Sequence, residues 1–228
     1  MKKLFSILNI ITFLASVSVT VIYYFFYGGT FMKGITSFMF VIVGLVNLIY
    51  AFINKIEGKA FVILMNVALV ICMVADVILS INFMIGALVF ALGHVVYFIS
   101  YCKLQKFNLK DLIPIALMFV ISLIFLMLPI YDYGSDIMFF VIVFYGLIIS
   151  CMVGKAAGSL LKNKCRVNIM ILIGSIMFYL SDLMLLVSIF ADAPEIANFL
   201  CCFFYWPGQT LLAHTLFHYT ENKIKQRA

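Results

Sequence analysis

Apolar stretches about 20 residues long follow one another along almost the whole chain, and only short polar connections separate them. They do not alternate between apolar and polar residues with a period of two, so they are typical of membrane-spanning helices rather than of barrel strands. The chain is 66% hydrophobic and 11% charged, whereas a soluble domain is about 45–50% apolar and about 25% charged. The sequence therefore predicts an all-α integral membrane protein with no room for a soluble domain.

The boundaries of these stretches, taken at charged residues, glycines and prolines, predict about eight transmembrane helices in a single helical-bundle domain over residues 1–228. The first stretch follows Lys2 and Lys3 and so resembles a secretory signal. Its apolar core is longer than such signals have, and we interpret it as a retained helix. The expected helices are approximately Leu4–Phe26, Met32–Ile53, Ala60–Ile81, Met84–Cys102, Leu112–Ile130, Asp136–Gly154, Val167–Phe190 and Ile196–His218.

Positive charge is distributed unevenly between the two sets of connections. Of the 15 lysines and arginines, all except Lys33 fall on one side of the predicted topology. Because connections rich in Lys and Arg stay in the cytoplasm, we expect a multi-pass protein of the cell membrane with both termini cytoplasmic. The acidic residues Asp132, Asp192 and Glu195 fall on the Lys33 side and are expected to be solvated. The basic connections account for the net charge of +6, so no nucleic-acid partner is needed.

Neither the cysteines nor the histidines have the spacing of a metal site. The six cysteines include no C-x-x-C pair and are expected to be small buried hydrophobic residues. His214 and His218 form an i, i+4 pair, but no carboxylate or cysteine accompanies them at that depth, so we expect them at the membrane interface. We predict no metal site and no cofactor.

Two aspartates lie inside apolar stretches and in similar local sequences, Asp76 within Val74–Leu79 and Asp182 within Leu180–Leu185. A carboxylate at membrane depth is costly unless it is protonated or paired, so such residues usually face an internal cavity and have a function. A single aspartate could instead make a structural hydrogen bond between helices. Two of them in matching sequences favour a paired site.

Two further polar residues fall at a similar depth. A rise of about 1.5 Å per residue puts Asp76 roughly 9 Å and Asp182 roughly 13 Å from the predicted non-cytoplasmic end. The same measure puts His94 at roughly 15 Å and Gln209 at roughly 18 Å. The sequence therefore predicts one polar layer built from four helices. Pro207 should kink the last of these helices and free a backbone carbonyl beside the site.

Helical spacing adds candidates for substrate binding or support, each on the same helix face as a member of this layer. They are Ser80 near Asp76, Tyr97 and Tyr101 near His94, and Tyr205 near Gln209. The layer also suggests two four-helix parallel repeats, an Asp/His half over about residues 4–102 and an Asp/Gln half over about residues 112–218. Such a repeat would put the site on the pseudo-symmetry axis. The halves match weakly elsewhere, so a bundle without a repeat stays open.

Four short motifs follow one another along the chain. They are A-D-x-x-L with G-H-x-x-Y-x-x-x-Y (Ala75 to Tyr101), the segment Tyr145 to Ala156, G-x-x-x-F-x-x-S-D (Gly174 to Asp182) and the aromatic-x-x-x-Gln segment Tyr205 to Gln209. In order and spacing this set resembles the lysoplasmalogenase (YhhN-like) family of polytopic membrane proteins over about residues 60–215. The chain departs from the family pattern in having Ala75 where a Gly is usual and Asn54–Glu57 where a Lys-Pro pair is expected.

The resemblance implies a membrane-embedded hydrolase that cleaves the vinyl-ether bond of lysoplasmalogens to a fatty aldehyde and a glycerophospho-alcohol. Its partners would be a lysophospholipid substrate, water and the lipid bilayer. An enol ether is cleaved by protonating its β-carbon, and one protonated and one ionised carboxyl would suffice for this acid/base chemistry. Two close carboxyls naturally share one proton. We expect Asp76, beside His94, to be the ionised member of the aspartate pair and Asp182 the acid, although the opposite assignment stays open. Gln209 could hold the water.

Two other classes of function stay open. Intramembrane carboxyls also mark ion pathways, so a small-molecule or proton-coupled transporter is the main alternative. Broken helices in both halves and a water path to each face of the membrane would favour it. The departures from the family pattern also leave room for a non-catalytic lipid-binding membrane protein. Head-group preference, chain length and oligomeric state do not follow from the sequence.

Overall fold

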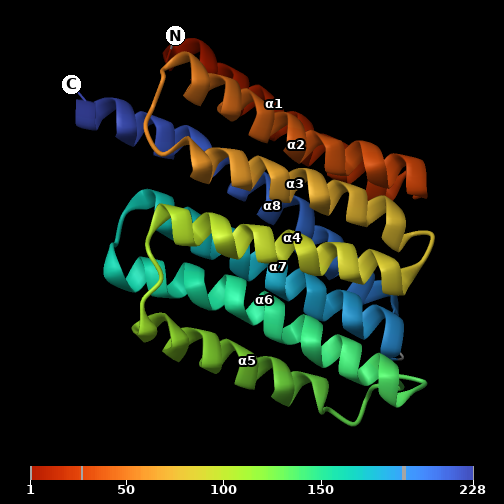
Figure 1. Ribbon diagram of the computed structural model, residues 1–228. Coiled ribbons are helices and arrows are strands. Elements are labelled where there is room, and N and C mark those ends of the chain that lie inside the picture. Colours follow the sequence, from red (N-terminus) through yellow and green to blue (C-terminus); the bar gives the residue numbers. More distant parts are fainter. Residues whose placement is uncertain (1, 27, 192–193, 228) are drawn as a thin grey trace.

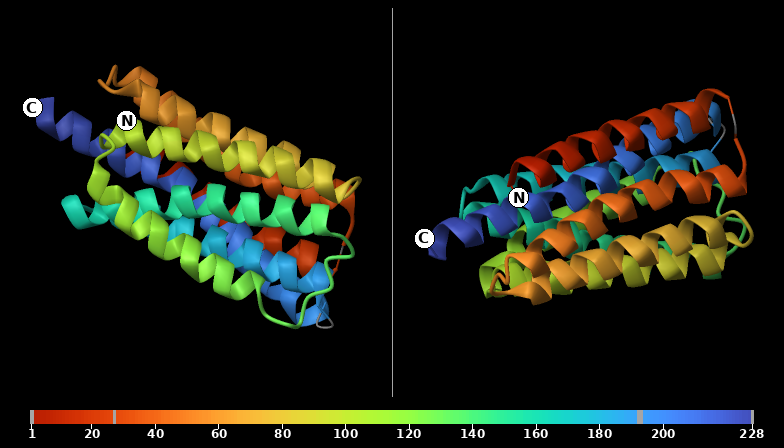
Figure 2. Two further views of the ribbon diagram at one scale, coloured as in Figure 1. Left: turned by 60° about the horizontal axis from the view of Figure 1, so that its bottom comes forward. Right: turned by 90° about the horizontal axis from the view of Figure 1, so that it is seen from above.

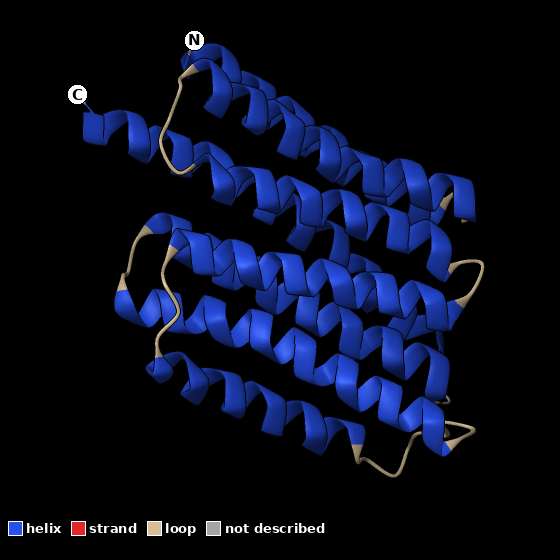
Figure 3. Ribbon diagram, in the orientation of Figure 1, coloured by secondary structure: helices blue, strands red, loops and turns tan. Residues whose placement is uncertain are grey.

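The computed structural model describes residues 2–26, 28–191 and 194–227, and every regular element within them is helical. Seven of the eight α-helices, all except α8, are long and apolar enough to cross a membrane. The described chain is therefore an all-α, multi-pass membrane protein, as the sequence predicts. The helices are α1 (Lys2–Phe25), α2 (Thr30–Ile53), α3 (Lys59–Leu79), α4 (Phe83–Leu104), the short 3-10 helix η1 (Leu109–Asp111), α5 (Leu112–Leu126), α6 (Asp136–Lys162), α7 (Arg166–Phe190) and α8 (Pro194–Arg227) (Figures 1 and 3).

Three helices, α5, α6 and α8, end more than two residues away from their predicted ends. α5 ends at Leu126, earlier than expected, because Pro129 follows and the residue before a proline disfavours the helical conformation. α6 continues beyond the predicted end to Lys162. The prediction took Lys155 as the edge of the membrane, whereas its side chain is completely buried inside the protein. The prediction thus mistook a lysine of a buried ion pair, Lys155 with Asp111, for the end of a membrane-spanning helix.

α8 is the longest helix and continues past its predicted end at His218 to Arg227. It remains helical on both sides of Pro207. Several of its polar side chains, such as Gln209, Thr210 and Thr215, are completely buried against other helices. α8 therefore buries several polar groups where it packs against α1, α2, α3 and α7.

Six helices form a ring in which each packs against the next, in the order α2, α3, α4, α6, α7, α8 and back to α2. α3 and α8 also contact each other across this ring. α1 lies outside the ring against α2 and α8, and α5 lies outside it against α6 (Figures 1 and 2). The functional candidates from the sequence all belong to helices of the ring, so its interior is where they can meet.

Both termini lie at one end of the bundle, together with the basic connections after α2, α4 and α6 (Figure 1). We call the opposite end, which bears Lys33, the Lys33 end. The cytoplasmic location of the termini stays a prediction. The internal repeat also stays a prediction, although α1 and α5 take corresponding positions outside the ring. Asp132 and Glu195 are exposed, while Asp192 lies outside the described residues.

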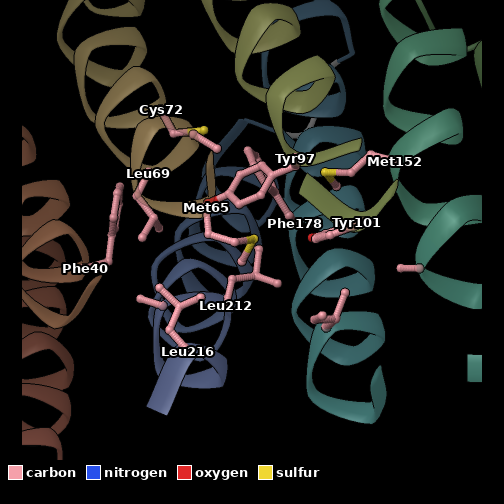
Figure 4. Close-up of a cluster of buried hydrophobic side chains, with 14 of the residues drawn as sticks. Phe40, Met65, Leu69, Cys72, Tyr97, Tyr101, Met152, Phe178, Leu212 and Leu216 are labelled. Carbon is pink, nitrogen blue, oxygen red and sulfur yellow. The ribbon is translucent and has the colours of Figure 1, made fainter. Parts of the chain in front are cut away.

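The ring encloses a core of large apolar side chains contributed by most of its helices. Phe40, Met65, Leu69, Phe178 and Leu212 are all completely buried (Figure 4). Large apolar side chains on the outer helix faces are exposed instead, as expected for surfaces that contact lipid. The core therefore holds the ring together from within.

Helices α7 and α8 approach each other closely at a pair of glycines, Gly174 and Gly208. A Cβ atom at Gly174 would lie 2.8 Å from the side chain of Leu212 and 3.1 Å from the carbonyl oxygen of Gly208. Small residues at such crossings let two membrane helices pack backbone to backbone. The crossing fixes α7 against α8 within about two turns of Asp182 and Tyr205.

Candidate active site

Asp76 on α3 is buried and surrounded by hydrogen-bond donors. Its Oδ2 atom accepts a 2.5 Å hydrogen bond from the Ser37 hydroxyl and a 2.7 Å bond from the Tyr205 hydroxyl. The indole N–H of Trp206 donates to Ser37 Oγ at 3.1 Å and so orients that hydroxyl toward the carboxylate. Lys33 Nζ lies 4.0 Å from Asp76 Oδ1. Two donated hydrogen bonds and a nearby cation favour the ionised carboxylate.

Asp182 on α7 lies in a different cluster, formed with α4 and α6. Its Oδ2 atom accepts a 2.6 Å hydrogen bond from the Tyr145 hydroxyl and lies 3.1 Å from His94 Nε2. His94 Nε2 also lies 2.8 Å from the Tyr145 hydroxyl, and its Nδ1 lies 3.4 Å from Met152 Sδ. His94 is completely buried, whereas the Asp182 side chain keeps 11% of its surface exposed. Asp182 therefore has an imidazole as its neighbour where Asp76 has an ammonium group.

The hydrogen bonds of this cluster require one proton between Asp182 and His94. Tyr145 has a single hydroxyl hydrogen and donates it to Asp182. The contact between Asp182 Oδ2 and His94 Nε2 needs one hydrogen, because two facing lone pairs would repel. His94 Nδ1 faces a sulfur, a weak acceptor toward which it can direct its own N–H. The hydrogen between Asp182 and His94 belongs either to His94 Nε2, which then donates to Asp182, or to Asp182 Oδ2, which then donates to the imidazole.

The two carboxyl groups border one cavity of about 60 Å³ at the Lys33 end of the ring. Within the described chain, no hydrogen bond joins them, so the directly shared proton expected from the sequence is not present. They belong to α3 and α7, which do not pack against each other. A cavity of this size with several polar walls has room for water. The pair can therefore communicate only through water or a bound molecule. The cavity is lined by Tyr23, Lys33, Asp76, Leu79, Phe90, Ser181, Asp182, Leu185, Asn198, Cys201, Cys202, Tyr205 and Trp206.

A second cavity, of about 50 Å³, begins at Asp182 and is almost wholly apolar. Asp182, Leu79, Phe90 and Leu185 line both cavities, so the two spaces meet at these four residues. We call the second one the apolar groove. The residues lining it come from α3, α4, α6 and α7: Leu79, Phe83, Met84, Ala87, Phe90, Met138, Val141, Ile142, Tyr145, Asp182, Leu185 and Leu186.

The structure corrects the predicted partner of His94. The sequence analysis put this imidazole beside Asp76, but it contacts Asp182 instead. Depth along the membrane does not give the direction in which each helix face points. Since α4 packs against α6 as well as α3, His94 on its α6-facing side meets Tyr145 rather than Asp76.

Four other predicted residues do not line the cavity. Tyr97 donates a 2.6 Å hydrogen bond to Gln209 Oε1, and both side chains are completely buried. Tyr101 pairs with Ser175 Oγ at 2.9 Å. Ser80 is exposed and donates to the backbone carbonyl of Asp76 at 3.2 Å rather than to its carboxylate. Of the predicted support residues, Tyr205 contacts the carboxylate of Asp76 and His94 that of Asp182.

The sequence analysis did not single out four residues that contact the aspartates or orient those contacts. Lys33 was noted only as the exceptional lysine of its side, and that isolation was a usable signal. Tyr145 and Trp206 lie within the motif segments already described, although neither had been given a role. Ser37 carries no signal, because serines are common in membrane helices and nothing in the sequence connects α2 to Asp76.

The histidine pair near the end of α8 serves packing contacts. His214 Nδ1 lies 3.0 Å from Asn9 Oδ1 on α1, and the rings of His214 and His218 are in edge contact with centroids 5.3 Å apart. Within the described residues, no group of three or more His, Cys, Asp and Glu side chains is arranged to hold a metal ion.

The fold and site define a class: a multi-pass helical membrane protein with two buried aspartates at one internal cavity. Comparison with known families assigns it more closely. The YhhN family matches residues 30–216, so the chain belongs to the YhhN family, the family of lysoplasmalogenases. The match covers all of α2 to α7 and most of α8, including Lys33, Asp76 and Asp182, while α1 falls outside it. No curated protein and no solved structure matches the chain.

Proposed function

We propose that the protein is a membrane-embedded lysoplasmalogenase that hydrolyses the vinyl-ether bond of lysoplasmalogens. The observation that carries this proposal is that Asp76 and Asp182 border one cavity and have different partners there. Lys33 and two hydroxyl groups stabilise Asp76 as a carboxylate. Asp182 holds a proton together with His94. One base and one acid at a single cavity are what this hydrolysis needs.

In the proposed reaction, the proton held by Asp182 and His94 moves to the β-carbon of the enol ether. The carbon attached to the ether oxygen then becomes part of an oxocarbenium ion, which the Asp76 carboxylate stabilises by its charge. Asp76 takes a proton from the water that attacks this carbon, and a hemiacetal forms. In the collapse of the hemiacetal, Asp76 gives its proton to the glycerol oxygen as that C–O bond breaks, and the Asp182–His94 pair takes the proton of the hemiacetal hydroxyl. A fatty aldehyde and a glycerophospho-alcohol are released, and both aspartates return to their starting states. The two products together contain the atoms of the vinyl ether and of one water molecule.

The roles of acid and base therefore match the expectation from the sequence, but for a different reason. The expectation used His94 to favour ionisation of Asp76, whereas Lys33 is the cation near Asp76. Water or substrate, rather than a direct hydrogen bond, would connect the two carboxyls. Such a separation resembles that of glycosidases in which acid and base act from two sides of the reacting bond.

The packing between the cavity and the basic end of the bundle supports transport less well than hydrolysis. Between the cavity and the basic end of the bundle lie the completely buried side chains of Phe178, Tyr97 and Tyr101. Phe178 contacts both His94 and Tyr205, with ring centroids 4.5 and 5.3 Å apart. A carrier would need a path for water through this layer. A closely packed layer on one side favours a site that is reached from one end or from the bilayer.

The test is aldehyde release from a lysoplasmalogen by the full chain in detergent micelles, with Asp76→Asn and Asp182→Asn measured in parallel. Each substitution should lower kcat by about 10²–10⁴-fold, because each removes one partner in proton transfer. Asp136→Asn, at the exposed start of α6, is the matched control and should keep full activity. Full activity in either site variant would contradict the mechanism, and an inactive parent chain would contradict the hydrolase.

A further inference from the structure

Lys33, the one lysine on its side of the predicted topology, lies beside the polar cavity. It lies in the first turn of α2, with 21% of its side chain exposed, and it lines the polar cavity together with Asp76. Its ammonium group is 4.0 Å from Asp76 Oδ1, beyond hydrogen-bonding distance. The ammonium group therefore compensates the charge of Asp76 across a gap, and among the described residues its N–H groups donate no hydrogen bond to the protein.

Other donors surround the same part of the cavity. Tyr23 on α1 and Asn198 near the start of α8 line it, and Asn198 is exposed at the Lys33 end. An ammonium group, a phenol and a carboxamide are suited to bind the oxygen atoms of a phosphate. Lys33 would then lie between two anions, the Asp76 carboxylate and the bound phosphate, and would reduce the repulsion between them.

The apolar groove gives the complementary half of a binding site for an amphiphile. It leaves the polar cavity at Asp182 and is lined by side chains such as Phe83, Met84 and Met138. Met84 is 40% exposed on the outer face of the bundle, so the groove reaches the surface that contacts lipid. At about 50 Å³ it holds only the first carbons of a chain, and the remainder would stay in the bilayer.

We propose that Lys33, with Tyr23 and Asn198, forms a subsite for the phosphate of a single-chain ether phospholipid whose chain leaves through the apolar groove. This inference rests on the proposed function and adds the orientation of its substrate. A molecule bound in this way carries its charged group at the Lys33 end and its ether bond near Asp182, where the two cavities meet. The protein should therefore bind ether lipids that carry a phosphate more tightly than ether glycerols that lack one.

Trp206 provides a direct signal for occupancy that does not need catalysis. It is the sole tryptophan of the chain, and it lines the polar cavity. Its emission can be followed in the full chain in maltoside micelles, which contain no phosphate. The probes are a 1-O-alkyl lysophosphoethanolamine, whose saturated ether resists this hydrolysis, and the matching 1-O-alkylglycerol without phosphate.

The parent chain should bind the phospholipid more tightly than the alkylglycerol. Lys33→Gln should weaken phospholipid binding about tenfold or more, because a charge-assisted hydrogen bond is lost, and leave alkylglycerol binding unchanged. Lys33→Arg should retain most of the preference for phosphate. Lys164→Gln, at an exposed lysine of the α6–α7 connection, is the control and should change neither affinity.

Equal weakening of both lipids by Lys33→Gln, or no change in either, would overturn the phosphate subsite. Inorganic phosphate, which lacks the chain, should leave Trp206 emission unchanged; a response as large as that to the lipid would also overturn it. The outcome is separable from the proposed reaction. If the parent chain releases no aldehyde but binds phospholipid in a Lys33-dependent way, the hydrolase is wrong and the subsite stands.

Discussion

Asp111 and Asp76 are both almost completely buried aspartates, but the cations around them differ. Asp111, at the end of η1, has Lys155 Nζ at 3.0 Å and Lys162 Nζ at 2.6 Å, and it accepts a 2.9 Å hydrogen bond from the backbone N–H of Asn108. Asp76 has one lysine at 4.0 Å and is otherwise held by hydroxyl groups. Asp111 is neutralised by close contact, whereas Asp76 keeps an accessible charge.

The packing around the two aspartates differs in the same way. Beside Asp111, the backbone of Gly158 approaches so closely that a Cβ atom there would collide with the carboxylate. Asp76 instead borders a cavity, as does Asp182. A buried acid with two bonded lysines and tight packing fixes the connection before α5 onto α6. A buried acid with fewer cations and open space beside it can meet a ligand.

The largest effect on stability is expected at Asp111. Asp111→Asn leaves the completely buried ammonium group of Lys155 without its counter-charge, and breaking such a pair costs about 3–5 kcal/mol. The thermal unfolding midpoint of the purified chain should therefore fall strongly. Asp182→Asn is the matched variant, and it should lower activity while changing the midpoint little, because its cluster carries no buried lysine. Equal midpoints for the two variants would break the distinction between a structural and a functional aspartate.

A smaller effect, on activity alone, is expected at Tyr145. Tyr145→Phe removes the 2.6 Å hydrogen bond to Asp182 and the contact with His94 Nε2. A hydrogen bond to a charged group contributes about 1.5–3 kcal/mol, so kcat for aldehyde release should fall about tenfold to a hundredfold. Phe125→Leu, at a partly buried residue of α5, serves as a packing control. Unchanged kcat in Tyr145→Phe would mean that this hydroxyl does not help to position Asp182 and His94 for proton transfer.

The helices could be predicted because the bilayer fixes their length. Every spanning segment needs about 20 apolar residues, so apolar stretches bounded by charged residues, glycines and prolines located the eight helices. The errors arose where charge and burial disagree. Lys155 was read as the membrane edge, since a sequence does not reveal that this lysine pairs with Asp111 inside the bundle.

The candidate site could be predicted in part. Matching local sequences identified Asp76 and Asp182, and the structure brings them to one cavity. Their partners depend on which helix faces which, and that is decided by packing. Gly174 and Gly208 set the approach of α7 to α8, and the contact between α4 and α6 brings His94 to Tyr145. Contacts of this kind join residues far apart in the chain and leave no periodic signal.

The smallest effect is expected at Tyr97, which offers the same chemical change as Tyr145→Phe at a place away from the cavity. Tyr97→Phe removes the hydrogen bond to Gln209 Oε1, and the amide nitrogen of Gln209 already lacks a partner within the described chain. An unsatisfied buried acceptor costs about 1–3 kcal/mol, so the unfolding midpoint should drop modestly. Activity should stay within about twofold, because neither residue borders the cavity shared by Asp76 and Asp182. A twofold change in rate corresponds to about 0.4 kcal/mol in the activation free energy. A loss of kcat comparable with that of Tyr145→Phe would mean that the functional region extends inward to Gln209. Burial without a cavity would then no longer separate structural polar residues from functional ones.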